Sequence, residues 1–63
     1  MNGYYSKVVE QLKKHKYRYL EPGKGSHEIW TNDVHNQTVP FHCKSRHTAN
    51  EIMKQAGIDH RFR

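Results

Sequence analysis

The sequence has few of the features that staple small proteins together or anchor them in membranes. Cys43 is the only cysteine, so no disulfide can form within the chain, although small secreted domains usually depend on such bonds. No apolar run approaches the roughly 20 residues of a membrane-spanning helix, and the polar, tyrosine-rich N-terminus is unlike a signal peptide. We therefore expect a cytoplasmic protein that does not associate with membranes.

Acidic residues are also scarce, which gives the chain a positive charge. Eleven Lys and Arg residues stand against six Asp and Glu residues, for a formal net charge of +5, and six histidines can add to this charge in acid. A basic excess favours an anionic partner, either nucleic acid or an acidic protein, although it can also serve solubility alone.

The short length limits what the chain can build. A protein of 63 residues buries only about 60% of the surface that its unfolded chain exposes. We therefore expect one domain, residues 1–63, in which helices pack on one small sheet. Such a core leaves no room for a deep cofactor cavity, so no cofactor is expected, and a large substrate would bind at the surface.

Two segments have the apolar spacing of amphipathic helices, with apolar residues at positions i, i+3, i+4 and i+7. In residues 5–16 this stripe is formed by Tyr5, Val8, Val9 and Leu12. Near the C-terminus it is formed by Ala49, Ile52, Met53 and Ala56.

The second of these helices also has terminal signals. Thr48 and Glu51 have the spacing of a capping box at its start, and Gly57 is placed to end it. Ile58 should then fold back onto the core, and residues 59–63 should form a short polar tail.

The segment between the helices predicts three strands, over residues 17–20, 26–32 and 37–41. Pro40 cannot donate to a strand ladder, so it marks an edge strand or the end of a strand. The order helix, strand, strand, strand, helix indicates an α+β fold with a three-stranded antiparallel sheet. Both helices should cover the same face of that sheet, which leaves the opposite face or the rim for a partner.

The stretch Gly23-Lys24-Gly25-Ser26-His27 is the clearest candidate for chemistry. It places a histidine directly after a flexible turn, at the start of the second predicted strand. Histidine titrates near neutral pH, with a reference pKa of about 6.5, so it suits general acid–base catalysis. An imidazole beside a lysine suggests phosphodiester chemistry. From the residues alone, a solvent-facing or hydrogen-bonded histidine at the rim of the sheet is an equally good interpretation.

His42 is a second candidate, and its role depends on strand register. If paired positions of the second and third strands sum to 69, His42 lies directly across from His27, whereas a shift of one residue sends the two side chains to opposite faces. Alternatively, His42 caps a backbone carbonyl at the end of a strand. His42, Cys43 and His47 could also be read as metal ligands, but the fourth ligand of a closed zinc site is missing, so no metal site is expected.

Basic residues gather in two places that could contact RNA phosphates. The first group is interleaved with tyrosines and comprises Lys13, Lys14, Lys16 and Arg18. The second precedes the last helix and comprises Lys44 and Arg46. Such charge can hold a phosphate backbone while aromatic rings stack on bases. A lysine-rich helix end can also simply be solvated and favour the helix dipole. Trp30, on a small strand, is interpreted as a core residue.

Several motifs in this order resemble the HicA toxins, the small ribonuclease partners of HicA–HicB toxin–antitoxin pairs. The motifs are Gly25-Ser26-His27, Thr38-Val39-Pro40-Phe41-His42, Arg46-His47-Thr48-Ala49-Asn50 and Ile52-Met53-Lys54-Gln55-Ala56-Gly57-Ile58. The resemblance covers nearly the whole chain, and it implies an α-β-β-β-α fold like that of a double-stranded-RNA-binding domain. Many members begin the last helix with Gly-Thr-Leu, whereas this chain has His47-Thr48-Ala49, so a substrate contact from that loop does not carry over.

The resemblance also implies a function. HicA toxins are metal-independent endonucleases that cleave mRNA and arrest translation, and their catalytic histidine, in the Gly-Ser-His motif, corresponds to His27. Lys24 and Ser26 beside it, and His42, are candidate supporting residues. The implied partners are mRNA and a HicB-like antitoxin whose partial RNase-H-like domain covers the active site.

Two other functions remain open for a chain with this pattern. The first is an RNA-binding module of the same fold that does not cut RNA. The second is a partner module whose role is to occupy an acidic antitoxin, without catalysis.

Overall fold

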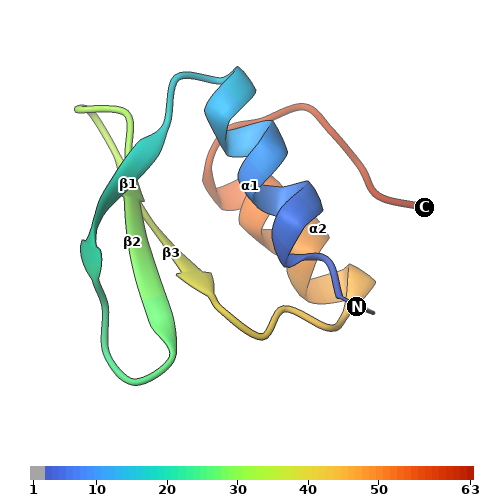
Figure 1. Cartoon of the computed structure of the whole chain (residues 1–63). Helices are drawn as coiled ribbons and strands as arrows, with labels where there is room; N and C mark the ends of the chain where they lie inside the picture. The colour runs from blue at the N-terminus through green and yellow to red at the C-terminus, as the bar shows by residue number, and fades with distance from the viewer. Residues whose placement is uncertain (1–2) are drawn as a thin grey trace.

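A computed structural model describes residues 3–63 of the chain. The elements follow the predicted order, which confirms the α-β-β-β-α fold class (Figure 1). They are α1 (Tyr5–Lys14), β1 (Arg18–Pro22), β2 (His27–Thr31), β3 (Asn36–Pro40) and α2 (Arg46–Gln55). The α-β-β-β-α order is consistent with the fold of double-stranded-RNA-binding domains.

The three strands form an antiparallel sheet in the order β1-β2-β3, and both helices lie on one side of it (Figure 1). Successive residues of a strand face opposite sides. In β2 the side chain of Trp30 points to the helices and is buried, whereas that of His27 points away from them and is exposed. The rim and the outer face of the sheet are therefore left for contacts with a partner.

The strand boundaries differ from prediction mainly in β1, which extends to Pro22 instead of ending at residue 20. A β-bulge lies between Tyr19 and Glu21, where the pairing with β2 shifts. The bulge adds a residue to an edge strand, and Pro22 is tolerated because an edge strand has a side without a ladder partner. The third strand ends at Pro40, one residue before its predicted end, and the end of a strand is one of the two positions expected for this proline.

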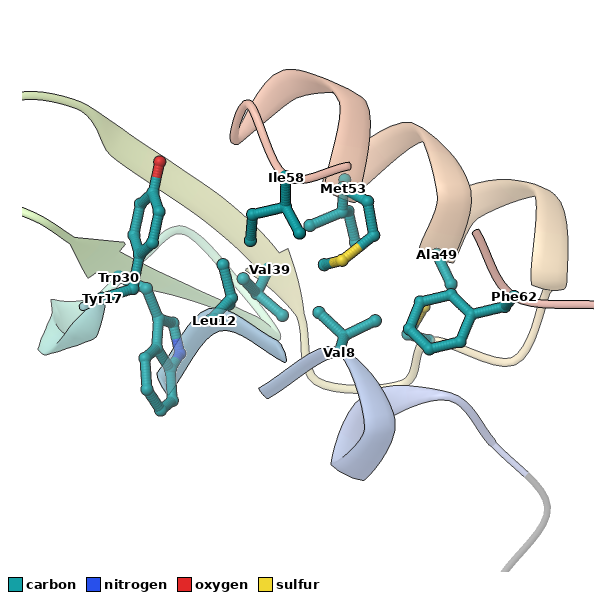
Figure 2. Packing of buried hydrophobic residues seen from close by; sticks show 11 residues of the cluster. Val8, Leu12, Tyr17, Trp30, Val39, Ala49, Met53, Ile58 and Phe62 are labelled. Carbon is teal, nitrogen blue, oxygen red and sulfur yellow. The ribbon is translucent and has the colours of Figure 1, made fainter. Parts of the chain in front are cut away.

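The core lies between the helices and the sheet. Val8 and Leu12 of α1, Val39 of β3 and Met53 of α2 have no solvent exposure, and Figure 2 shows them pointing toward one another. Trp30 belongs to the same cluster, so its interpretation as a core residue is confirmed. Each apolar side chain of this size contributes roughly 1.5–3 kcal/mol when fully buried.

Helix α2 begins earlier than the capping-box pattern predicted. Ser45 is its N-cap, and the Ser45 side chain accepts a hydrogen bond from the Thr48 backbone N–H. Thr48 is thus the third residue of the helix, and the prediction that it caps the helix was wrong. Two hydroxyl residues three positions apart compete for this role, and the extended backbone at Ser45 decides in its favour.

The end of α2 follows the prediction. Gly57 has a positive φ of 74°, and its N–H donates to the Lys54 carbonyl, while the Ile58 N–H donates to the Met53 carbonyl. This pair of bonds defines a Schellman motif, the usual way in which a glycine ends a helix. It returns the buried side chain of Ile58 to the core.

The last residues are not the polar tail that the sequence suggested. Phe62 is buried and packs edge-on against the ring of Tyr4. Asn50 of α2 holds the Phe62 backbone at both polar groups, since its Oδ1 accepts from the Phe62 N–H at 2.7 Å and its Nδ2 donates to the Phe62 carbonyl at 3.2 Å. Phe62 is a single aromatic residue among charged ones, so the sequence of residues 59–63 has no periodic apolar pattern that predicts its burial.

Helix α1 ends in the same kind of motif as α2, but with lysine in the position usual for glycine. Lys16 has a positive φ of 70°, and the Tyr17 N–H donates to the Leu12 carbonyl. Tyr17, predicted to open the first strand, is instead buried, and its hydroxyl donates to the Ala56 carbonyl at the end of α2.

We predict that Lys16→Gly stabilises the protein. A residue with a side chain loses roughly 1–2 kcal/mol in this left-handed conformation, and glycine avoids that loss at a smaller entropic cost. The net gain should be about 0.5–1 kcal/mol, or several degrees in Tm, measured by thermal and urea denaturation. As the control, Lys14→Gly, at the last residue of the helix, should instead destabilise by up to about 1 kcal/mol. Equal losses of stability in Lys16→Gly and Lys14→Gly would contradict the prediction.

Candidate active site at the start of strand β2

His27 stands at the first position of β2, held by the turn that joins β1 to β2. The Gly23 N–H donates to the His27 carbonyl at 2.8 Å, and the His27 N–H donates to the Lys24 carbonyl at 3.2 Å. Gly25 has a positive φ of 62°, a conformation that glycine adopts without penalty. The turn thus fixes the backbone of His27 while leaving its side chain exposed.

The imidazole itself is held by the same turn. Its Nδ1 lies 2.9 Å from the Lys24 carbonyl oxygen. A carbonyl oxygen can only accept a hydrogen bond, so Nδ1 must carry the proton. In the neutral ring, Nε2 then has a free lone pair on the solvent side. The turn therefore orients the ring as a proton acceptor at Nε2, the arrangement that a general base requires.

Gly23 lies so close to His27 that a side chain there would press on it. A Cβ atom at position 23 would stand 3.2 Å from the His27 carbonyl oxygen and 3.3 Å from the His27 Cβ. A side chain at position 23 would therefore crowd His27, and glycine lets the turn approach the histidine closely.

Lys24 and Ser26 both adjoin His27, but through their backbones. The Lys24 carbonyl orients the imidazole, and its side chain is exposed in the turn. The Ser26 carbonyl accepts a hydrogen bond of 2.7 Å from the Phe41 N–H, which ties the turn to the end of β3. Their side chains remain candidates for contact with a substrate.

The register that would place His42 opposite His27 is not the one observed. His27 pairs with Pro40, and paired positions of β2 and β3 sum to 67 instead of 69. The strand ends at Pro40, and His42 lies in the turn that follows, where its ring packs edge-on against that of Phe41. The hypothesis of two directly paired histidines was therefore wrong, because nothing in the alternation of β3 distinguishes a shift of two residues.

A hollow lies beside the turn that follows β3, between the start of α1 and the loop that leads to α2. Its volume is about 680 Å³, and it is lined by Gly3, Tyr5, Ser6, Phe41, His42, Cys43 and Lys44. We call it the Phe41 hollow, after the half-exposed ring on its wall. A smaller, basic hollow of about 310 Å³ lies at the start of α2, lined by Arg46, Asn50, Arg61, Phe62 and Arg63.

The six predicted RNA contacts separate into two groups. Lys44 lies in the loop after β3, and Arg46 is the first residue of α2. That loop leaves the end of the sheet at which β2 begins (Figure 1). The other four lie at the opposite end, where α1 passes into β1: Lys13, Lys14, Lys16 and Arg18. The structure therefore does not bring them all around His27.

Some charges of that distant group already have partners. Arg18 makes a two-pronged ion pair with Asp33, at 2.8 and 2.9 Å, and this pairing lowers the pKa of the Asp33 carboxyl. Lys14 lies 3.8 Å from Glu10, and Lys13 lies over the ring of Trp30. These contacts agree with the alternative interpretation of this segment as a solvated helix end.

Glu28, next to His27, was not identified from the sequence. Its Oε1 accepts hydrogen bonds from the Tyr5 hydroxyl at 2.6 Å and from Trp30 Nε1 at 3.1 Å. Burial, together with the hydrogen bond to Glu28, raises the pKa of Tyr5 to about 12. The only available signal was the spacing of Glu28 and Trp30, which places both on the helix-facing side of β2. The carboxylate fastens the first turn of α1 to the strand that carries His27.

Two further observations concern metal ligands and membranes. Within residues 3–63, no three His, Cys, Asp or Glu side chains are grouped so that they could hold a metal ion. Cys43 is buried, and burial raises the pKa of its thiol. Neither helix in this part of the chain is long and apolar enough to span a bilayer.

The orientation of the His27 ring gives a spectroscopic prediction. At a pH where the imidazoles are neutral, ¹⁵N NMR should show the His27 proton on Nδ1, because the Lys24 carbonyl accepts it. His15, whose Nδ1 lies 2.8 Å from the Gln11 carbonyl, should behave in the same way. Gly23→Ala should weaken the preference at His27 and leave His15 unchanged. A His27 proton found on Nε2 in the unmodified protein would refute the arrangement.

Comparison with known proteins gives one match. The family described as "HicA toxin of bacterial toxin-antitoxin" matches residues 5–58, a span from the first residue of α1 to the residue that closes the Schellman motif of α2. No curated protein and no solved structure matches the chain. The matched span holds the turn with His27, the sheet and both helices, and we conclude that this chain belongs to the HicA toxin family, the toxins of bacterial toxin–antitoxin systems.

Proposed function

We propose that this toxin is an endoribonuclease that cleaves mRNA and so arrests translation, with His27 as its general acid–base residue. The observation that supports this most directly is the hydrogen bond from His27 Nδ1 to the Lys24 carbonyl, which leaves Nε2 free to accept a proton. Membership of the HicA toxin family supports an RNA target.

The proposed reaction begins at the 2′-hydroxyl of the RNA. Nε2 of His27 takes the hydroxyl proton as the 2′ oxygen attacks the adjacent phosphorus. The bond from phosphorus to the 5′ oxygen then breaks, and that oxygen takes up a proton. Acid–base chemistry of this kind typically contributes 10²–10⁴-fold to a rate and requires no metal ion.

Other groups at this end of the sheet would support His27. The exposed Lys24 ammonium, in the same turn, can stabilise negative charge on the phosphorane. His42 and Lys24 are the candidates for the acid that protonates the leaving oxygen. We propose that Lys44, in the loop after β3, and Arg46, the first residue of α2, bind flanking phosphates.

The proposed protein partner is a HicB-like antitoxin. A toxin of this class acts together with an antitoxin, and we propose that it covers the end of the sheet that carries His27. The exposed side chains of His27 and Lys24 make that end accessible to such a partner.

We predict that His27→Ala lowers the RNA cleavage rate by about 10²–10⁴-fold, because it removes the proton acceptor but no buried contact. Binding of RNA and the melting temperature should change little. His15→Ala is the matched control, since His15 is also exposed and also bonds a backbone carbonyl, but at the opposite end of the molecule. If His27→Ala cleaves RNA and stops growth as the unmodified protein does, the catalytic assignment fails.

A second prediction concerns the nucleophile. An oligoribonucleotide with a single 2′-deoxyribose on the 5′ side of the cleaved bond should resist cleavage at that bond, because the attacking oxygen is missing. Gel analysis should show cutting of this oligonucleotide only at other positions. With the unmodified substrate, the upstream fragment should end in a 2′,3′-cyclic phosphate. Normal cleavage at the deoxyribose, in the presence or absence of a chelator, would indicate that water is the nucleophile.

A further inference from the structure

We propose that the Phe41 hollow binds one unpaired nucleobase of the RNA, stacked on the ring of Phe41, beside the phosphodiester bond whose cleavage His27 promotes. This inference rests on the proposed ribonuclease function and gives it a substrate class: RNA that is single-stranded at the site of cutting.

The ring of Phe41 is exposed and yet fixed in position. Half of Phe41 (50%) is open to solvent. Edge-on contacts hold its ring, with centroid distances of 5.2 Å to Tyr5 and 5.2 Å to His42. Tyr5 is in turn fixed by its hydrogen bond to Glu28. A large apolar ring left open on a small protein costs free energy in water, and a held, half-exposed ring is what proteins use to stack RNA bases.

Phe41, on the wall of the hollow, is hydrogen-bonded to the turn that carries His27. The Phe41 N–H donates to the Ser26 carbonyl at 2.7 Å, and the next pair along the ladder is His27 with Pro40. Paired residues face the same side of a sheet, and consecutive residues face opposite sides. At this end of the sheet, the side chains of His27 and Phe41 therefore point to opposite faces. An RNA strand that crosses this end can place one base on Phe41 and present an adjacent phosphate to His27.

The electrostatics of the hollow suit a nucleotide. Its described lining residues include Lys44 and His42 and no Asp or Glu. Lys44 can pair with a phosphate while the ring takes the base, a combination common in sites for single-stranded nucleic acid. The volume of about 680 Å³ admits a flat base. A base within a duplex is stacked and paired, so it is not available for such a pocket.

The test measures RNA binding in the His27→Ala variant, in which cleavage is expected to be slow compared with the binding measurement. In this variant, we expect Phe41→Ala and Phe41→Leu to weaken binding of a short single-stranded oligoribonucleotide by roughly 5- to 150-fold, the effect of losing one stacked base. Leu20→Ala is the matched control, since Leu20 is similarly exposed (43%) but lies on the outer strand β1. The double variant with His27→Ala and Leu20→Ala should bind the oligoribonucleotide as tightly as His27→Ala alone does. Thermal melts check that every variant is folded.

A set of oligonucleotides with one abasic position each makes the test specific to stacking. The abasic substitution at one position should weaken binding to the protein with Phe41 and have no further effect on Phe41→Ala. Phe41→Trp should keep its affinity, and its fluorescence should be quenched by single-stranded RNA and not by a duplex. These results together would support the proposed base site.

Two outcomes would overturn it. If Phe41→Ala binds RNA as tightly as Leu20→Ala does, no base stacks there. If Phe41→Ala loses affinity only for the antitoxin, the hollow is a protein interface. Both results are independent of catalysis. Failure of the ribonuclease proposal would appear separately, as absence of RNA cleavage by the unmodified protein, and failure of the His27 assignment would appear as undiminished cleavage by His27→Ala.

Discussion

The contact between the two helices and a single face of the sheet is the constraint on which the molecule depends. Val8, Leu12, Val39 and Met53 lie within it and have no solvent exposure. A chain of this length has apolar side chains for only one such layer, so the outer face and the ends of the sheet are left without cover. The candidate chemistry is found at one of these uncovered ends, where β2 begins, β3 stops and α2 starts.

That end is made rigid by hydrogen bonds more than by burial. Glu28 fastens α1 to β2, Ser26 fastens the turn to Phe41, and Lys24 orients the ring of His27. An exposed side chain usually samples several rotamers, and its alignment costs entropy when substrate binds. The carbonyl of Lys24 reduces that cost for the imidazole before any substrate arrives.

Much of the fold could be predicted from the sequence, because its signals are local. The apolar stripes of both helices, the role of Gly57 and the end of β3 at Pro40 follow from neighbours within a few residues. The competition between Ser45 and Thr48 could not be resolved in this way, since both hydroxyls are good caps. Phe62 could not be placed either, because its burial depends on Asn50, twelve residues earlier in the chain.

The candidate site could be predicted only in part. The motif and its glycine turn pointed to His27, and the structure gives its ring an orientation suited to a base. The neighbours of His27 depend on strand register, and the polar and apolar alternation of β3 does not distinguish shifts of two residues. Glu28 and the Phe41 hollow were missed for a different reason, because both depend on contacts that the start of α1 makes with residues more than twenty positions further along the chain.

The clamp between Asn50 and Phe62 has a consequence for synthesis of the toxin. A ribosome releases the chain from the N-terminus, so α1 and the sheet emerge well before Phe62 can reach its place beside Tyr4. The apolar contact that Phe62 completes is therefore among the last to form. Until Phe62 has been made, Asn50 lacks the backbone groups that it binds and the ring of Tyr4 lacks one aromatic neighbour, so this part of the packing depends on a residue that is synthesised after both helices and the sheet.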